Sequence, residues 1–530
     1  MKPVMKFLPV LALLAGTPLA AQQLEPIDLG VLNEIKWEAF NNSQVMDHLF
    51  YLSDVHGPRV TSSANYRAAA EWTMKRLESY GLKNVHLEPW GPFGNGWQYK
   101  KFYGALVEPN YAPLIGFPLA WSPGTKGPVT AEAILAPLAS QEDFAKFKGK
   151  LAGKIVLIAA PKAIDMHTEA EAHRLTAQEI EARATVPDPS RLGSNGRPPA
   201  PPTDRAKVLK LRNDISRFLS EEGAVVAVNY GTNGDGGTVF ATWGGSQNPD
   251  DPVPPPMVAI TPEHYNRVAR LLEHGFKPRL TFDIETEFYR DEQMGFNIIG
   301  EIPGTTKKDE VVMLGGHFDS WQGGTGATDN ATGSSVAIEA VRILTTLKKP
   351  MARTVRIALW GGEEQGLLGS RHYVQQHFAP RDTMKRTPEY DKLVAYYNDD
   401  SGSGRFRAVP ANGNLLTKAI FEQWIAPLKD LEITTVTAAT SAPTKEPGGT
   451  DHTSFTWIGL NGYGFLQDPL EYNTRTHHSN MDLYDRVQPG DVMQGAAIEA
   501  WFVYNTATRA QMLPRNPAPP PLPAPPPATP

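Results

Sequence analysis

The chain has no cysteine among its 530 residues. Disulfide bonds, thiol nucleophiles and cysteine-ligated metal ions are therefore excluded. A metal ion in this protein would have to be bound by histidine, aspartate and glutamate side chains.

A strong excess of one charge is also absent. The formal net charge is −6, and the sequence has no long block of lysine and arginine. Nucleic acids are bound through basic surfaces that neutralise phosphate groups, so this composition argues against nucleic acid as a partner. With 41% hydrophobic residues, the chain is expected to form a globular protein of roughly two to four domains.

Long hydrophobic runs are scarce, and the clearest one is near the N-terminus. The segment FLPVLALLAGTPLAA, residues 7–21, follows Lys2 and Lys6 and is shorter than the ~20 residues that a membrane span needs. This pattern is typical of a secretory signal peptide at residues 1–21, with cleavage after Ala21. We therefore expect an exported protein, periplasmic or extracellular, with no membrane span in the mature chain.

The sequence does contain a regular alternation of strand-like and helical segments. After Asn297, near-continuous apolar runs precede helical segments, which favours an α/β fold with a mostly parallel central sheet flanked by helices. We expect strands at 310–317, 354–361, 393–399 and 462–467, and helices at 333–347 and 367–378.

Short β-rich runs, helices and proline-rich turns alternate between residues 125 and 285. We predict a smaller inserted α/β domain at 125–285, with residues 22–124 and 286–512 forming one discontinuous larger domain. Within the insert, HTEAEAH at 167–173 is expected to be a solvated helix, because its histidines are six residues apart and do not match the helical zinc motif. The proline-rich residues 513–530 should form a disordered tail.

Acidic residues and histidines follow four of the expected strands. They are His317 with Asp319, Glu363 with Glu364, Asp399 with Asp400, and His477 with His478. Because the carboxyl ends of parallel strands meet at one edge of a sheet, these side chains should converge there. Asp329, expected to cap the next helix, should join them. Each pair alone is an ordinary surface feature, but their shared placement favours a common site.

Carboxylates that are buried together repel each other or lose their charge unless cations compensate them. Two zinc ions roughly 3.5–4 Å apart would supply that charge, ligated by three carboxylates and two neutral imidazoles. We therefore predict two Zn²⁺ ions per chain at this edge of the sheet.

Six motifs carry a resemblance to a known family. In chain order they are GGHFDSW, GATDNATG, LWGGEEQGLLGSRHY, NDDSGSG, GGTDHTSF and HHSNMD. This set resembles the co-catalytic two-zinc exopeptidases, which include secreted bacterial aminopeptidases and the carboxypeptidase Q branch. The latter branch is also similar in HGPRV and YGLKNVHLEPW, so the resemblance covers most of residues 45–505. The insert resembles a protease-associated domain.

The resemblance implies a role for each site residue. The implied metal ligands are His317 and Asp400 for one zinc ion, Glu364 and His478 for the other, and Asp329 as a bridge. Glu363 would be the general base that takes a proton from the attacking water and returns it to the leaving amine. The family spacing favours Asp400 over Asp399 as the ligand. The Asp329–Asn330 peptide bond would be cis.

Three further residues are implied beside these ligands. Asp319 would hold the second imidazole nitrogen of His317. Asp482 would do the same for His478. The adjacent His477 is a candidate hydrogen-bond donor to the tetrahedral oxyanion.

The implied function is a secreted zinc-dependent exopeptidase, either an aminopeptidase or a dipeptidase, that acts on peptides or dipeptides. Monomer and homodimer both remain open. One alternative is a carboxypeptidase acting on C-terminal residues. Another is a non-catalytic, receptor-like binding protein on the same fold, but such a protein would be expected to lack ligands or the base. The presence of all five ligands and Glu363 favours catalysis.

Overall fold

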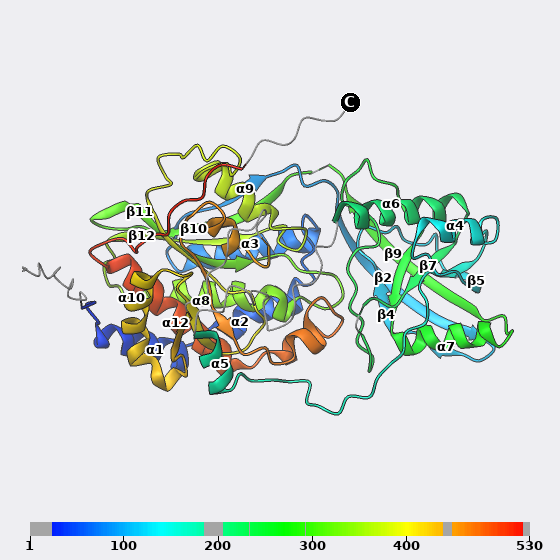
Figure 1. Cartoon of the computed structure of the whole chain (residues 1–530), viewed down its shortest axis with the longest axis horizontal. Helices are drawn as coiled ribbons and strands as arrows, with labels where there is room; N and C mark the ends of the chain where they lie inside the picture. The colour runs from blue at the N-terminus through cyan, green and yellow to red at the C-terminus, as the bar shows by residue number, and fades with distance from the viewer. Residues whose placement is uncertain (1–23, 185–204, 233, 292, 438–447, 523–530) are drawn as a thin grey trace, which may run out of the picture.

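The computed structural model describes residues 24–184, 205–232, 234–291, 293–437 and 448–522. These residues form two lobes, each built around its own sheet (Figure 1). The predicted signal peptide lies outside the described residues. Among the helices that are described, none combines the length and the apolar character needed to cross a membrane.

The larger lobe contains a six-stranded mixed sheet. Its order is β1 (Lys83–Trp90), β10 (Gly295–Ile302), β12 (Arg353–Trp360), β11 (Lys307–His317), β13 (Leu393–Asn398) and β16 (Gly462–Gly464). The strands from β12 to β16 are parallel, and β10 and β1 complete the sheet in antiparallel pairing. The expected α/β fold with a mostly parallel central sheet is confirmed.

Helices cover both faces of this sheet, which explains why its strands are apolar almost throughout. In β11, Val312 and Leu314 face one hydrophobic core and Met313 faces the other. The first core is completed by α1 (Leu29–Asn41), α2 (Val45–Phe50), α3 (Ala64–Ser79), α8 (Thr332–Thr346), α10 (Leu415–Ile425) and α12 (Pro489–Thr508), and the second by α9 (Leu368–His377) and α11 (His452–Thr456).

The single strand expected at 462–467 is wrong. β16 ends at Gly464, which pairs with Asn398, the last residue of β13. Because its neighbour ends there, the chain leaves the central sheet. The next residues form β17 (Leu466–Gln467), which belongs to a three-stranded sheet with β14 (Phe406–Pro410) and β15 (Thr435–Thr437).

The smaller lobe is built on an eight-stranded sheet. Its order is β3 (Ala112–Pro113), β2 (Gly96–Glu108), β9 (Arg279–Tyr289), β5 (Val129–Leu135), β6 (Ile155–Leu157), β7 (Val226–Asn229), β8 (Met257–Ile260) and β4 (Gly116–Pro118). Helix α7 (Pro262–Glu273) packs in one core of this lobe, and α4 (Gln141–Phe147) and α6 (Arg205–Glu221) pack in the other. Since β2, β3 and β4 precede residue 125, this sheet begins earlier in the chain than the predicted insert.

A connection, which we call the arm (residues 161–184), runs from the smaller lobe back to the larger one (Figure 1). Its residues 167–173 are not helical, so the helix expected there is wrong. The backbone N–H and carbonyl of His173 instead form hydrogen bonds with Leu470 of the larger lobe, at 3.0 and 2.8 Å. The arm ends in α5 (Ala177–Ala184), whose Ile180 is buried.

Residues 513–522 lie against the larger lobe, so the expectation of a disordered tail is wrong for them. Leu513 is buried. The carbonyls of Pro514 and Pro520 accept hydrogen bonds from side chains of the larger lobe at 3.2 and 2.6 Å. Proline has no N–H to donate, so these two prolines form hydrogen bonds through their carbonyl groups. Residues 523–530 lie outside the described residues.

Candidate metal centre

His317 is the last residue of β11 and is almost completely buried. Its Nδ1 forms a 3.0 Å hydrogen bond with the backbone carbonyl of Asp319, which fixes the orientation of the ring. The other ring nitrogen, Nε2, lies 3.2 Å from Asp329 Oδ1 and 3.3 Å from Asp400 Oδ1. One imidazole nitrogen and two carboxylates therefore meet at the end of the parallel strands.

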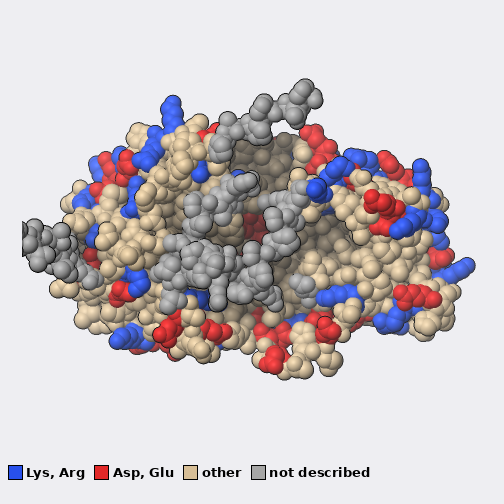
Figure 2. Space-filling model, viewed as in Figure 1, with Lys and Arg blue, Asp and Glu red and all other residues tan. Residues whose placement is uncertain are grey.

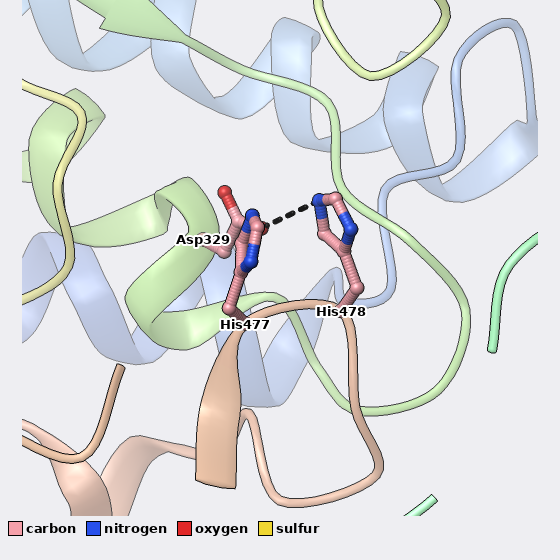
Figure 3. A group of neighbouring side chains, drawn as sticks. All are labelled: Asp329, His477 and His478. Atoms are coloured by element: carbon pink, nitrogen blue, oxygen red, sulfur yellow. Dashed lines mark ion pairs between the residues drawn. The ribbon is translucent and has the colours of Figure 1, made fainter. Parts of the chain in front are cut away.

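Asp329 contributes one carboxylate oxygen to each of two groups of side chains. Its Oδ1 faces His317, whereas its Oδ2 lies 3.2 Å from Nε2 of His478 and 3.8 Å from Nε2 of His477. Figure 3 shows Asp329 with these two histidines, which come from one loop after the short helix 472–476. The Asp329–Asn330 peptide bond is cis, as the resemblance implied.

Glu364 completes the second group. Its Oε2 lies 2.9 Å from His478 Nε2, and it reaches this position because it follows β12 at the same sheet edge. Glu364 Oε1 and Asp329 Oδ2 are buried, yet neither has a hydrogen-bond partner among the described residues. Buried carboxylate oxygens normally have partners, so an ion or water is expected beside them.

The donor set and its spacing fit metal ions. Two ligand atoms about 2.0 Å from a tetrahedral zinc ion lie roughly 3.3 Å apart. The three contacts of Asp329 and Asp400 with the histidine nitrogens, at 3.2 to 3.3 Å, match this value. They are longer than the roughly 2.7–2.9 Å of a charge-assisted hydrogen bond. The 2.9 Å contact of Glu364 is the exception.

The electrostatics of the cluster show that it needs positive charge. Burial raises the pKa of Glu364 to about 7. Burial by itself would lower the pKa of His478, but Glu364 and Asp329 raise that pKa to about 11. The pKa of His317 is likewise raised, because Asp400, Asp319 and Asp329 outweigh its burial. The acids thus favour positive charge at this site, which divalent cations would provide while leaving the imidazoles neutral.

Glu363 stands beside this cluster without an ion pair to it among the described residues. Its side chain lines the same cavity as the metal-ligand candidates, and its backbone N–H donates to Asp319 Oδ1 at 3.2 Å. Burial raises the pKa of Glu363 well above its usual range, and His317 opposes that shift. A carboxyl group of raised pKa that faces a cavity is suited to proton transfer.

The cavity has a volume of ≈ 570 Å³. Figure 2 shows acidic side chains at the bottom of the hollow between the two lobes. Asp400 lines this cavity, whereas Asp399 is buried and does not. The geometry therefore places Asp400, not Asp399, with the other ligand candidates.

Two of the expected supporting contacts are different in the structure. The backbone carbonyl of Asp319 is the hydrogen-bond partner of His317 Nδ1. The carboxylate Oδ1 of Asp319 is 3.6 Å away and instead accepts from the backbone N–H of Glu363. Asp482 accepts hydrogen bonds from the backbone and side chain of Thr328, at 2.5 and 2.8 Å. It therefore supports the loop that carries Asp329 rather than an imidazole.

The sequence reasoning assigned no role to Arg59. This arginine is fully buried and donates to the carbonyls of Phe318 and Gly326 at 2.8 and 3.0 Å. It thereby joins the loop after His317 to the loop before Asp329. Its motif, HGPRV, was recognisable by resemblance, but no local pattern indicates what a lone arginine will contact.

The fold and the site together indicate a metallopeptidase, and comparison with known proteins shows which peptidases are similar to this chain. Residues 297–501 match the profile of peptidase family M28. Human carboxypeptidase Q is 26% identical over 473 residues, which are 89% of this chain and 86% of the relative. An aminopeptidase of Pseudomonas aeruginosa is 36% identical, but over 24% of this chain and 22% of its own length.

Solved structures share the fold. A peptidase M28 precursor from Shewanella amazonensis has a TM-score of 0.63 at 22% identity, covering 93% of this chain and 98% of that one. A zinc aminopeptidase from Bacillus subtilis has a TM-score of 0.54 at 18% identity, covering 88% and 95%. The chain is a metallo-exopeptidase, and its residues 297–501 are similar to peptidase family M28.

Proposed function

We propose that this chain is an exported exopeptidase that holds two zinc ions and either removes the N-terminal residue of a peptide or splits a dipeptide. The observation that carries the proposal is the position of Asp329. Its two oxygens face two separate sets of candidate metal ligands. His317 and Asp400 lie on one side, and His478 and Glu364 lie on the other. A carboxylate shared in this way suits a bridge between two ions.

Each group at the site would have a separate role in hydrolysis. Bound zinc supplies positive charge that polarises the scissile carbonyl and makes water more acidic. Glu363 accepts the proton of the attacking water and passes it to the amine of the leaving group. His477 lies beside His478 in the same cavity, with ring centroids 3.8 Å apart, and burial lowers its pKa. It is the candidate donor to the oxygen of the tetrahedral intermediate.

Three parts of the proposal rest on the sequence. Export rests on the leader at residues 1–21, and the protease-associated nature of the insert rests on its resemblance. The assignment of catalysis over a receptor-like role rests on Glu363, which a binding protein would not need beside a full ligand set. The choice between amino- and dipeptidase activity requires a substrate comparison.

Metal content and activity of the purified protein test the proposal together. We expect two zinc ions per chain by elemental analysis, and zinc-dependent hydrolysis of dipeptides and aminoacyl anilides. Glu363→Gln should retain its zinc and lose activity by about 10²–10⁴-fold, because only the proton transfer is removed. Asp329→Ala should lose both zinc and activity.

The exposed Glu422 on α10 offers a matched control, since it lies outside the cavity. Glu422→Gln should retain both zinc and activity. Less than one zinc ion per chain, or full activity in Glu363→Gln, would show that the proposed function is wrong.

A further inference from the structure

Two residues of the arm line the cavity of the metal centre. They are Leu175 and Arg183, and both reach the cavity from a segment that leaves the smaller lobe. Arg183 lies in the last turn of α5 and is exposed to solvent. The arm thus brings a positive charge to a cavity whose other charged residues are acids and histidines.

The arm is fixed to the larger lobe immediately before α5. Arg174 forms ion pairs with Asp468 at 3.0 Å and Asp491 at 2.8 Å, and both of these carboxylates are buried. The backbone N–H of Leu175 also donates to Asp468 at 2.9 Å. With Ile180 buried in addition, α5 has a defined position, so the placement of Arg183 at the cavity is a property of the fold.

Arg183 differs from Arg174 in the contacts of its side chain with the described residues. Among the described residues its guanidinium forms no ion pair and no hydrogen bond, and Arg183 is the one lysine or arginine that lines this cavity. Two of the acids that line the cavity, Asp329 and Asp400, already face an imidazole nitrogen of His317. The guanidinium is therefore available to a molecule that enters the cavity.

We propose that Arg183 binds a carboxylate of the peptide substrate, so that the enzyme prefers substrates that carry this carboxylate. The inference rests on the proposed function, because it assumes that a peptide occupies this cavity. A guanidinium presents paired N–H donors that match the two oxygens of a carboxylate. The carboxylate belongs either to the free C-terminus of a short peptide or to an acidic side chain, and the two sources can be separated by experiment.

The test compares a dipeptide that has a free C-terminus with the same dipeptide amidated, in the full chain loaded with zinc. The wild type should favour the free acid in kcat/KM by about tenfold, the low end for a charge-assisted hydrogen bond because Arg183 is exposed. Arg183→Gln should remove the preference for the free acid and leave kcat/KM for the amidated substrate unchanged. Arg183→Lys should keep part of the preference, because it retains the charge and loses the planar fork.

Arg270 supplies a matched control, since it is an exposed arginine on α7 of the smaller lobe, outside the cavity. Arg270→Gln should keep the wild-type ratio. The source of the carboxylate is read from two amidated dipeptides that end in glutamate or glutamine. A preference for glutamate that Arg183→Gln removes assigns the site to an acidic side chain, and a preference confined to free C-termini assigns it to the terminal carboxylate.

The inference would be overturned if both ratios of kcat/KM, free acid to amide and glutamate to glutamine, were the same in Arg183→Gln as in the wild type. Hydrolysis of an aminoacyl anilide, which has no carboxylate, separates that result from failure of the proposed function. If the anilide is cleaved and neither of the two kcat/KM ratios changes in Arg183→Gln, only the role of Arg183 is wrong. If neither anilide nor dipeptide is cleaved by the zinc-loaded protein, the proposed function is wrong as well.

Discussion

Single residues at this site act through contacts that connect loops. Arg59 is the clearest case, because its guanidinium also donates to the carbonyls of Leu52 and Thr325, at 2.6 and 3.2 Å. Burial lowers the pKa of Arg59 to about 10, so the side chain keeps its charge at neutral pH. The backbone around His317 and Asp329 is therefore held by one buried cation.

Replacing this cation should destabilise the protein severely. In Arg59→Met, several buried carbonyls lose their donors, and the free energy of unfolding should fall by about 3–5 kcal/mol. Urea unfolding followed by tryptophan fluorescence measures the change. Arg217→Met on α6, at an exposed ion pair, should change it by less than about 1 kcal/mol. Equal stability of Arg59→Met and the wild type would contradict this role.

At the scale of elements, the C-terminal segment stabilises the larger lobe although it has no regular structure. Asn516 donates to the carbonyl of Asn412 at 2.7 Å, in addition to the contacts of Pro514 and Pro520. We expect a chain that ends at Leu513 to unfold at a lower temperature than one that ends at Leu522. Each lost kcal/mol lowers the melting temperature of a large domain by about 2–4 °C.

The two truncations form their own control, because they differ by residues 514–522 alone. Differential scanning calorimetry of both chains measures the effect. Identical melting temperatures would show that the observed contacts contribute nothing to stability.

The elements that could be predicted are those whose sequence pattern is local. The parallel strands and the helices α8 and α9 were expected within a few residues of their observed bounds, because burial on both faces imposes a continuous apolar run. The arm and the C-terminal segment were not, because their backbone groups bond to distant parts of the chain. Neither hydrophobic periodicity nor proline content reports such bonds.

At the scale of the whole molecule, a cluster of charges joins the two lobes near the site. His167 of the arm contacts Glu171 and lies 2.7 Å from Asp235 of the smaller lobe. Arg475, from the short helix 472–476 that precedes His477, pairs with the same two acids at 2.8 Å each. The hydrogen bond to Asp235 and the charges of both acids raise the pKa of His167.

This cluster predicts a pH dependence of stability. The pKa of His167 in the folded state is raised above the value of about 6.5 that applies to the unfolded chain. Its contribution is therefore fully present below about pH 6.5 and is lost as the pH rises through the folded-state pKa. His167→Gln should lower the melting temperature more at about pH 5.5 than at about pH 9.

Thermal unfolding of both proteins across this range measures the difference. His274→Gln, at an exposed histidine at the end of α7, is measured in parallel as the matched control. A His167→Gln effect that is constant with pH would indicate that the imidazole contributes by packing and not by charge.

The sequence by itself determined the α/β class, the parallel strands and the types of side chain at their carboxyl ends. These follow from apolar runs, from the residues that interrupt them, and from the rule that parallel strands end at one sheet edge. It also determined that cysteine could not bind the metal, since the chain has none.

Only the tertiary structure decided how those side chains meet. It placed the two oxygens of Asp329 against two sets of candidate ligands, brought Asp400 rather than Asp399 into the cavity, and placed Arg183 of the arm at the same cavity. The physical reason is that these contacts join positions far apart in the chain. Their distances depend on how loops and lobes pack, which no local sequence pattern specifies.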